Sequence, residues 1–469
     1  MTGNEYVPRG IILCISVILL LVLSAHVPVC AAAERVEFTE AVTRALANNA
    51  ALSAAGHEWT SARREADVAR GDYLPNLAFE GRFSRTSIPA QAFSMKINQS
   101  RFELQDFAVE NINNPDPLNN YMTAFTLSQP LFAPKAFLRY RMAGRDAEAK
   151  GLDVSRIKEQ VVFQVLTSYL DVLTVKEFVR VADQEVSDAR EHLRIADALE
   201  RSGMGLSSDV LRAKVALARA ESEKVSTENR LALARRSLGL AMGERGGIPV
   251  DAVGPVPALP KAGSLEERIA AVREHRMDLR AFSTRVANAD TNVTLQRAGY
   301  LPTVGVMGTY QLDSHDSPFS PDNRTWSVGV GIEWNLFDGL RREAAAAKAA
   351  ADRSKAEARY REAEDFAVFQ VTRAYLSVEE AARRVEIARA AVAASEEGTR
   401  LVKTRYENQL SRLIDLLDSQ AALHSSRADL VRAENDLRQS RARLEFVSGT
   451  LFPWVFSDAK GTGTGGGTR

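Results

Sequence analysis

The sequence predicts a mainly α-helical chain that also carries membrane β-strands and is built from two tandem structural repeats. Three observations lead to this prediction. Runs rich in Ala, Arg, Glu and Leu indicate long helices, short stretches alternate between apolar and polar residues as strands do, and several motifs occur twice at one spacing. The 469-residue chain is 26% charged and has a mean hydropathy of −0.19, which excludes a protein made mainly of transmembrane helices.

The repeated motifs lie 206 positions apart. Phe-Gln-Val at 163–165 returns at 369–371, Asp209 returns as Asp415, and Gly243 returns as Gly449. A spacing that three separated motifs share indicates an internal duplication. We therefore divide the chain into a signal peptide, a first repeat, a proline-containing linker, a second repeat and a partly disordered C-terminal tail, at residues 1–33, 34–242, 243–263, 264–449 and 450–469.

Each repeat is expected to contain a helix, two strands, a very long helix, a short break and a last helix. The helices are predicted at 39–70, 136–200 and 208–242, and again at 264–298, 340–405 and 412–447. A helix of about 65 residues is roughly 100 Å long at 1.5 Å per residue, so it must pack in a coiled coil or in the wall of a tube. A periplasmic coiled-coil scaffold without a pore remains the alternative, although it leaves the strands unexplained.

The strand pattern is that of a sheet with one apolar face. In 325–337, Trp326, Val328 and Val330 alternate with small or polar residues, and similar alternation occurs at 77–84, 121–127 and 304–312. These lengths approach the ~9–11 residues of a membrane-spanning strand. Four strands are too few to close a membrane barrel, which begins at about eight. If the strands lie in a membrane, two or three chains must pool them, because an open edge in lipid is costly; a soluble pair of hairpins is the alternative.

The first 33 residues predict a secretory signal peptide. Arg9 precedes an apolar run from 11 to 23, and Ala31, Ala32 and Ala33 supply the small residues of a cleavage site. An uncleaved anchor and a lipoprotein modified at Cys30 are the alternatives. Because Cys14 and Cys30 are the only cysteines, cleavage after any of these alanines leaves a mature chain without thiols.

Composition also argues against several functional classes. Lys+Arg and Asp+Glu both number 60, so the chain lacks the basic excess of a nucleic-acid binder. Six scattered histidines and no mature cysteine offer no metal-binding motif. No phosphate loop, nucleophile elbow or zinc-protease motif stands on a suitable element. We therefore expect no catalytic residues, no metal site and no cofactor.

Two pairs of motifs carry a family resemblance: the helix–turn–helix breaks at 201–210 and 406–420, and Tyr-Leu-Pro at 73–75 and 300–302. With these motifs the chain resembles the TolC-like outer-membrane efflux proteins, also called outer membrane factors. The resemblance covers most of the mature chain. It implies a homotrimer whose twelve strands, four per chain, form a β-barrel in outer-membrane lipid, continued into the periplasm by a long α-helical coiled-coil barrel. It also implies an outer-membrane channel subunit of a tripartite efflux or type I secretion system, conducting passively.

The resemblance further implies roles for residues of the two breaks. Asp415 and Asp418 match the acidic rings that close the periplasmic gate of the family; an ordinary solvated helix face is the alternative. Asp209 and Tyr406 match positions that link neighbouring helices, and Arg412 lies one place from the family's basic position, which is Ser411 here. A periplasmic adaptor, or membrane fusion protein, is expected to dock on Gly203, Met204, Gly205, Leu206, Asn408 and Gln409, with an inner-membrane pump of the RND, ABC or MFS type as further partner. Gly203 and Gly205 are both expected to supply the positive φ of a tight turn.

Overall fold

The computed structural model describes residues 33–320 and 323–457. The predicted signal peptide, except Ala33, lies outside the described residues, as do Cys14, Cys30 and the Gly/Thr-rich end at 461–469. The chain divides into two compact units. We call them the tip unit (Met1–Asn49, Val161–Pro260, Val378–Ala442) and the sheet unit (Ala50–Gln160, Lys261–Ser377, Arg443–Arg469), and describe each by its described residues.

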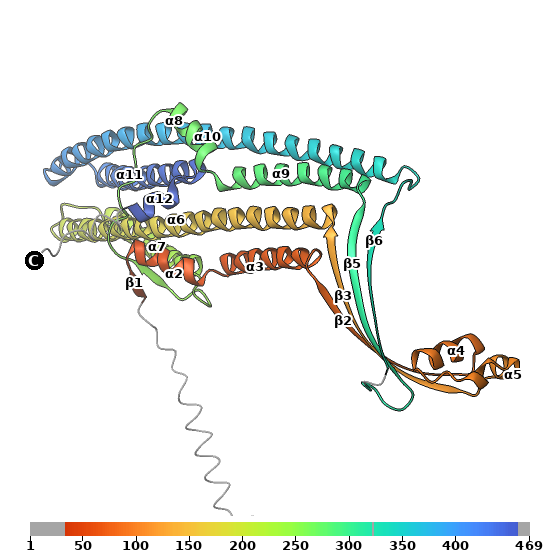
Figure 1. Ribbon diagram of the computed structural model, residues 1–469. Helices are drawn as coiled ribbons and strands as arrows, with labels where there is room; N and C mark the ends of the chain where they lie inside the picture. The colour runs from red at the N-terminus through yellow and green to blue at the C-terminus, as the bar shows by residue number, and fades with distance from the viewer. Residues whose placement is uncertain (1–32, 321–322, 458–469) are drawn as a thin grey trace, which may run out of the picture. The chain divides into compact units, whose positions relative to one another are not determined.

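The sheet unit contains the four predicted strands (Figure 1). They are β2 (Asn76–Thr86), β3 (Leu118–Phe132), β5 (Thr303–Ser314) and β6 (Arg324–Glu333). They lie in the order β2-β3-β5-β6, and every neighbouring pair is antiparallel. The prediction of four strands is therefore confirmed.

The last strand is shorter than predicted. The alternating pattern extended to Phe337, but β6 ends at Glu333, which pairs with Thr303 at the start of β5. Beyond that point β5 offers no further partner, and the polar groups of the segment bond elsewhere. Trp334 Nε1 donates to the Tyr300 carbonyl at 3.1 Å, and Arg342 donates to the Asn335 carbonyl at 2.8 Å.

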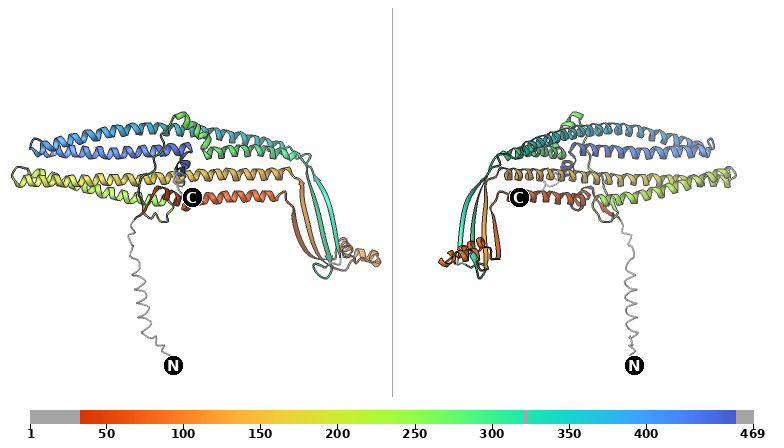
Figure 2. Two further views of the ribbon diagram at one scale, coloured as in Figure 1. Left: turned by 60° about the vertical axis from the view of Figure 1, so that its left-hand side comes forward. Right: turned by 90° about the vertical axis from the view of Figure 1, so that its right-hand side faces the viewer.

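The connection between β2 and β3 holds three short helices that the sequence analysis did not predict. These are α4 (Pro89–Asn98), η1 (Leu104–Phe107) and α5 (Val109–Asn113), which we call the strand insert. Edge-to-face contacts join the ring of Phe102 to those of Phe93 and Phe107. Figure 2 shows the strand insert at the end of the sheet opposite to α3 (Ala50–Gly71).

Four long helices dominate the rest of the chain. They were predicted to within a few residues and have the bounds α6 (Pro134–Arg201), α7 (Ser207–Ala241), α10 (Arg341–Glu407) and α11 (Leu413–Ser448). We call α6–α7 the first hairpin and α10–α11 the second hairpin. Both α6 and α10 contribute residues to both units.

The first helix of each repeat was predicted as continuous, and both predictions were wrong. The stretch at 39–70 is divided into α2 (Phe38–Asn48) and α3, and the stretch at 264–298 into α8 (Leu265–His275) and α9 (Met277–Arg297). The residue at each break has an extended backbone, with ψ of 120° at Asn49 and 110° at Arg276.

A glycine packs on each of these breaks. In the tip unit, a Cβ on Gly243 would lie 2.8 Å from the carbonyl carbon of Asn48; in the sheet unit, a Cβ on Gly449 would lie 3.0 Å from that of His275. Both glycines also have positive φ, 81° and 77°. Only glycine satisfies both conditions without strain.

The linker predicted at 243–263 is non-helical but not without structure. Its β4 (Val250–Ala252) pairs in parallel with β1 (Glu34–Val36) in the tip unit. The hydroxyl of Tyr169 donates to the Val253 carbonyl at 2.6 Å, and burial raises the pKa of this phenol to about 12. The predicted tail also contains a short helix, α12 (Leu451–Ser457).

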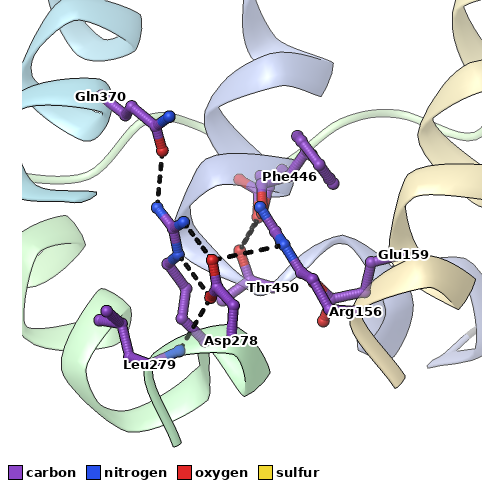
Figure 3. A network of polar contacts seen from close by, with 9 residues as sticks. Arg156, Glu159, Asp278, Leu279, Gln370, Phe446 and Thr450 are labelled. Atoms are coloured by element: carbon purple, nitrogen blue, oxygen red, sulfur yellow. Dashed lines mark hydrogen bonds and ion pairs between the residues drawn. The ribbon is translucent and has the colours of Figure 1, made fainter. Parts of the chain in front are cut away.

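A polar network holds the α8–α9 break within the sheet unit (Figure 3). The guanidinium of Arg276 donates to both oxygens of Asp278, at 3.0 and 2.5 Å, and to Gln370 of α10 at 2.8 Å. Arg156 of α6 pairs with Glu159 at 2.6 Å and lies 3.9 Å from Asp278. Burial alone would raise the pKa of Asp278, but the hydrogen bonds and charge of Arg276 and the charge of Arg156 hold it below its ordinary value.

Candidate functional site

One face of the four-stranded sheet is apolar across all four strands. The register places Phe79, Phe125, Tyr310 and Trp326 in one row, and the rings of Phe79 and Phe125 are 5.4 Å apart. Other rows on the same face carry further exposed apolar side chains: Leu77, Leu127, Val328, Val330 and Ile332. Trp326 is 76% exposed and Ile332 70% exposed. A face of this composition suits contact with hydrocarbon.

The opposite face of the sheet is mainly polar, with Met307 as an exposed apolar exception. Thr126, Thr309 and Ser327 form one row, in which the hydroxyls of Thr126 and Thr309 lie 3.2 Å apart. Near the strand insert, Asn120 Nδ2 donates to Asp313 Oδ1 at 2.8 Å. The predicted alternation of apolar and polar residues along the strands is confirmed.

The two outer strands, β2 and β6, each pair on one side only within the described part of the chain. Their outward backbone groups therefore have no strand partner among residues 33–320 and 323–457. In a bilayer each unsatisfied backbone group would cost several kcal/mol, so open edges of this kind are unfavourable in lipid. None of the described helices combines the length and the apolar character needed to cross a membrane.

The two hairpins end in turns with the same hydrogen-bond pattern. Met204 N–H donates to Leu199 O at 2.9 Å and Gly203 N–H to Glu200 O at 2.9 Å. In the second turn, Leu410 N–H donates to Arg405 O at 2.7 Å, and Gln409 N–H donates to the Tyr406 carbonyl at 2.9 Å. Both are Schellman helix ends, which need a residue with positive φ. Gly203 has a φ of 73° and Gln409 a φ of 60°.

Gly205 does not have the positive φ that the sequence analysis assigned to it. Its requirement is space: a Cβ at this position would lie 2.8 Å from Glu200 N and 2.9 Å from Leu199 Cβ. The two turns also contact each other, because Gln409 Nε2 lies 3.6 Å from Met204 Sδ. Met204, Leu206 and Leu410 are 64%, 66% and 70% exposed.

The two predicted gate carboxylates have different surroundings. Asp415 caps the start of α11: it accepts from Arg412 N–H at 3.0 Å, Ser411 Oγ at 3.1 Å and Arg412 Nη2 at 3.2 Å. These bonds, with that from the Arg412 backbone the strongest, lower the pKa of Asp415. Asp418 is exposed and makes no hydrogen bond or ion pair to another residue of the described ranges. Of these two carboxylates, only Asp418 is therefore free of bonds to other described residues.

The predicted linking residues lie close together in the tip unit but have local partners. Tyr406 is 7% exposed and packs with Ala196, Val210, Ala213, Leu413 and Leu416, a cluster that joins the two hairpins. Burial raises the pKa of Tyr406, and the charge of Asp209 adds to this. Asp209 lies 3.6 Å from Arg212 on its own helix, and Arg412 pairs with Asp415.

Sequence reasoning missed the left-handed conformation of Gln409 and the apolar packing of Tyr406. The spacing of 206 would have identified the first, because it relates Gln409 to Gly203. Within 33–320 and 323–457, no group of three or more His, Cys, Asp or Glu side chains is arranged to hold a metal ion.

Comparison with known proteins places these features in a family. The profile described as "Outer membrane efflux protein" matches residues 41–244 and 269–450, which is most of the chain. The chain belongs to this family. Its members are channel and transport proteins of the outer membrane rather than enzymes.

Individual relatives are distant but match over nearly their whole length. The "Proteases secretion protein PrtF" of Dickeya chrysanthemi is 22% identical over 87% of this chain and 87% of its own. "Protein CyaE" of Bordetella pertussis is 26% identical over 88% of this chain and 84% of its own. The solved structure of the outer membrane protein VceC from Vibrio cholerae has a TM-score of 0.74 at 16% identity, covering 88% of this chain and 96% of that chain, and shows the shared fold.

The chain is therefore a subunit of an outer-membrane channel that extends into the periplasm, as the sequence predicts. This outcome replaces the alternative of a periplasmic scaffold without a pore. A sheet with one apolar and one polar face suits the wall of such a channel.

Proposed function

We propose that three copies of this chain pool their strands into a twelve-stranded barrel and their long helices into a coiled-coil barrel that conducts substrates passively across the outer membrane and the periplasm. The observation that carries this proposal is the sheet with an apolar face and two unpaired edges, β2 and β6. Edges that are open in the described residues support an oligomer, and the family resemblance supports three copies rather than two.

We propose that the chain is two repeats, at 34–242 and 264–449, that share one ancestor. The element orders α2–α3–β2–β3–α6–α7 and α8–α9–β5–β6–α10–α11 support this. So do two pairs of positive-φ residues at a spacing of 206, Gly203 with Gln409 and Gly243 with Gly449. Each pair performs the same local task in its own half.

The tip is proposed as the periplasmic gate. Three copies of Asp418 around a three-fold axis would place like charges in a narrow mouth, where they repel each other and attract cations. Asp415 would contribute through the α11 cap as well as through its charge, because Arg412 already partners it. Asp209, Tyr406 and Arg412 would link neighbouring helices around this mouth.

The exposed turn residues are proposed as the docking surface for a periplasmic adaptor, which would connect the channel to an inner-membrane pump of the RND, ABC or MFS type. Gly203, Met204, Gly205, Leu206, Asn408 and Gln409 form this surface. The contact between Gln409 and Met204 supports their treatment as one surface rather than two. The chain itself would supply no energy.

Polypeptides are the cargo to test first. Two relatives that match 87% of this chain, PrtF and AprF, are named for protease secretion. A deletion strain would lose one or more proteins from the culture medium. A strain that instead becomes sensitive to toxic small molecules would favour efflux.

Reconstitution tests the channel itself. Purified protein in planar bilayers is expected to conduct, and chemical cross-linking of the same sample is expected to stop at three chains. A cysteine on β2 and one on β6, at the membrane ends of the edges, should form disulfides only between chains. A monomer that stays in solution without detergent would contradict the proposal.

A further inference from the structure

Two buried histidines lie between the hairpins of the tip unit. His192 of α6 is 4% exposed and His424 of α11 is 7% exposed. Both line a cavity of about 520 Å³ whose walls come from α6, α7 and α11, and Asp418 lines the same cavity. The proposed gate residue and the two imidazoles thus share one space.

The polar groups in this cavity are incompletely satisfied. Neither ring nitrogen of His192 has a hydrogen-bond partner among the described residues, and the same holds for His424 Nδ1 and Gln420 Oε1. The other nitrogen of His424, Nε2, lies 3.3 Å from Asp188 Oδ2. Buried polar groups are ordinarily paired, so several unpaired ones at one site call for an explanation.

One carboxylate stands beside two imidazoles. Asp188 lies one helical turn from His192 on α6, and its other oxygen accepts from Gln184 Nε2 at 2.9 Å. Its contact with His424 joins the first hairpin to the second. Asp188 is the carboxylate in direct contact with an imidazole, that of His424, whereas neither nitrogen of His192 bonds a described residue, so a charged His192 would have no bonded partner.

We propose that His192, Asp188 and His424 form a proton-sensitive latch that holds the two hairpins together at neutral pH and releases them on acidification. The proposal rests on the proposed function, in which the tip is the closed end of the channel. It adds a signal that opens this end, the proton, to the docking of an adaptor.

The charges around His192 set the direction of the effect. Burial lowers the pKa of His192, and the charges of Lys403 on α10 and His424 on α11 act in the same sense. Asp188 and Glu191 on α6 oppose them. The cavity is also lined by Glu185 of α6, Arg212 and Arg219 of α7, and Asp418 of α11.

The sign of the response follows. In the closed tip the His192 pKa is lowered, whereas separation of the hairpins returns it toward the ordinary value near 6.5. The open form therefore binds more protons, and acidification through and below about pH 6.5 favours it. The equilibrium shifts by up to about tenfold for each unit by which the pKa differs between the two forms.

Conductance of the full-length oligomer in planar bilayers tests the latch. The open probability of the wild type should rise at least about threefold between pH 7.5 and pH 5.5. His192→Gln, which cannot take up a proton, should abolish this rise. His57→Gln, the same change at an exposed position of α3, is the matched control and should respond like the wild type.

The outcomes separate the latch from the channel. If neither the wild type nor Asp415→Ala/Asp418→Ala conducts at any pH, the proposed function is wrong. If they conduct but His192→Gln keeps the full response to pH, the response belongs to other groups and the latch is wrong.

A measurement on the wild type avoids any effect of substitution on folding. Hydrogen–deuterium exchange at imidazole C2, followed by mass spectrometry, reports the pKa and accessibility of each histidine. His192 should exchange much more slowly than His57 at pH 7.5 and approach its rate at pH 5.5. Equal rates at both pH values would show that the cavity does not open, and the latch would be abandoned.

Discussion

Gln409 Nε2 lies 3.6 Å from the sulfur of Met204, so the turns that end the two hairpins meet side chain to side chain. Gln409 makes this contact from a left-handed backbone with a φ of 60°, the conformation that Gly203 adopts in the first turn. A glutamine there gives up stability that a glycine would keep. In return, the glutamine side chain supplies the contact between the two turns.

Gln409→Gly should therefore stabilise the protein while weakening adaptor docking. Relief of the left-handed conformation is expected to contribute about 1 kcal/mol to the free energy of unfolding. Denaturant unfolding in detergent measures the first effect, and co-purification with the adaptor measures the second. Gln409→Ala separates them, because it removes the side chain but keeps the strain. A less stable Gln409→Gly variant would contradict this account of the turn.

Gly449→Ala should destabilise the sheet unit by at least about 2 kcal/mol. The new methyl group needs a φ of 77° and lies 3.0 Å from the carbonyl carbon of His275. Gly398→Ala is the matched control: nothing lies within 4 Å of its Cβ position on α10, so this variant should gain up to about 1 kcal/mol from helix propensity. Thermal melts followed by circular dichroism distinguish the two signs.

Asp278→Asn should lower the free energy of unfolding by about 2 kcal/mol at pH 7, because it leaves Arg276 and Arg156 without their shared carboxylate. The folded-state pKa of Asp278 is lowered, so its contribution is present above the ordinary value near 3.9 and is lost as the pH falls through the folded value. The difference between variant and wild type should accordingly persist down to about pH 4 and shrink over the range below it. A constant difference over that range would assign the loss to packing instead.

Substitutions of the two proposed gate carboxylates should have different effects on stability. Asp418→Asn is expected to remove block by multivalent cations without changing thermal stability, since this side chain makes no bond in the described chain. Asp415→Asn should also reduce helix capping, because its carboxylate accepts from Arg412 N–H. Single-channel recordings with a trivalent cation measure block, and unchanged block in the double variant Asp415→Ala/Asp418→Ala would exclude the acidic ring.

Neighbouring residues of β6 should differ in their tolerance of charge. Val328→Lys places an ammonium on the apolar face and is expected to cost about 2–4 kcal/mol if it lies near the middle of the bilayer. Ser327→Lys places the same group on the polar face and should be tolerated. The yield of heat-modifiable oligomer in outer-membrane fractions compares them; equal yields would mean that the faces are assigned wrongly.

Much of the fold was readable from the sequence because it rests on strong periodicities. The two very long helices and the four strands have patterns long enough to exclude other structures, and their bounds differ from prediction by a few residues. The breaks at Asn49 and Arg276 were not readable. Neither residue is a helix breaker, and the breaks depend on Gly243 and Gly449, which are distant in sequence and pack against them.

The candidate site was only partly predictable for a similar reason. The turns could be located from their motifs, and the positive φ of Gly203 was predicted correctly. The positive φ assigned to Gly205 was wrong, because spatial proximity to Leu199 and Glu200, rather than backbone rotation, demands glycine there. The pairing of His424 with Asp188 joins residues that are 236 positions apart and lie on different hairpins, so no local sequence pattern predicts it.

The strand insert between β2 and β3 bears on which part of the channel is exposed at the cell surface. If the long helices enter the periplasm as proposed, the strands lead from these helices to the insert, and α4, η1 and α5 would emerge on the outside of the cell. Their exposed Leu104, Phe107 and Val109 would then be accessible from the surrounding medium. An epitope tag placed between η1 and α5 would be accessible on intact bacteria.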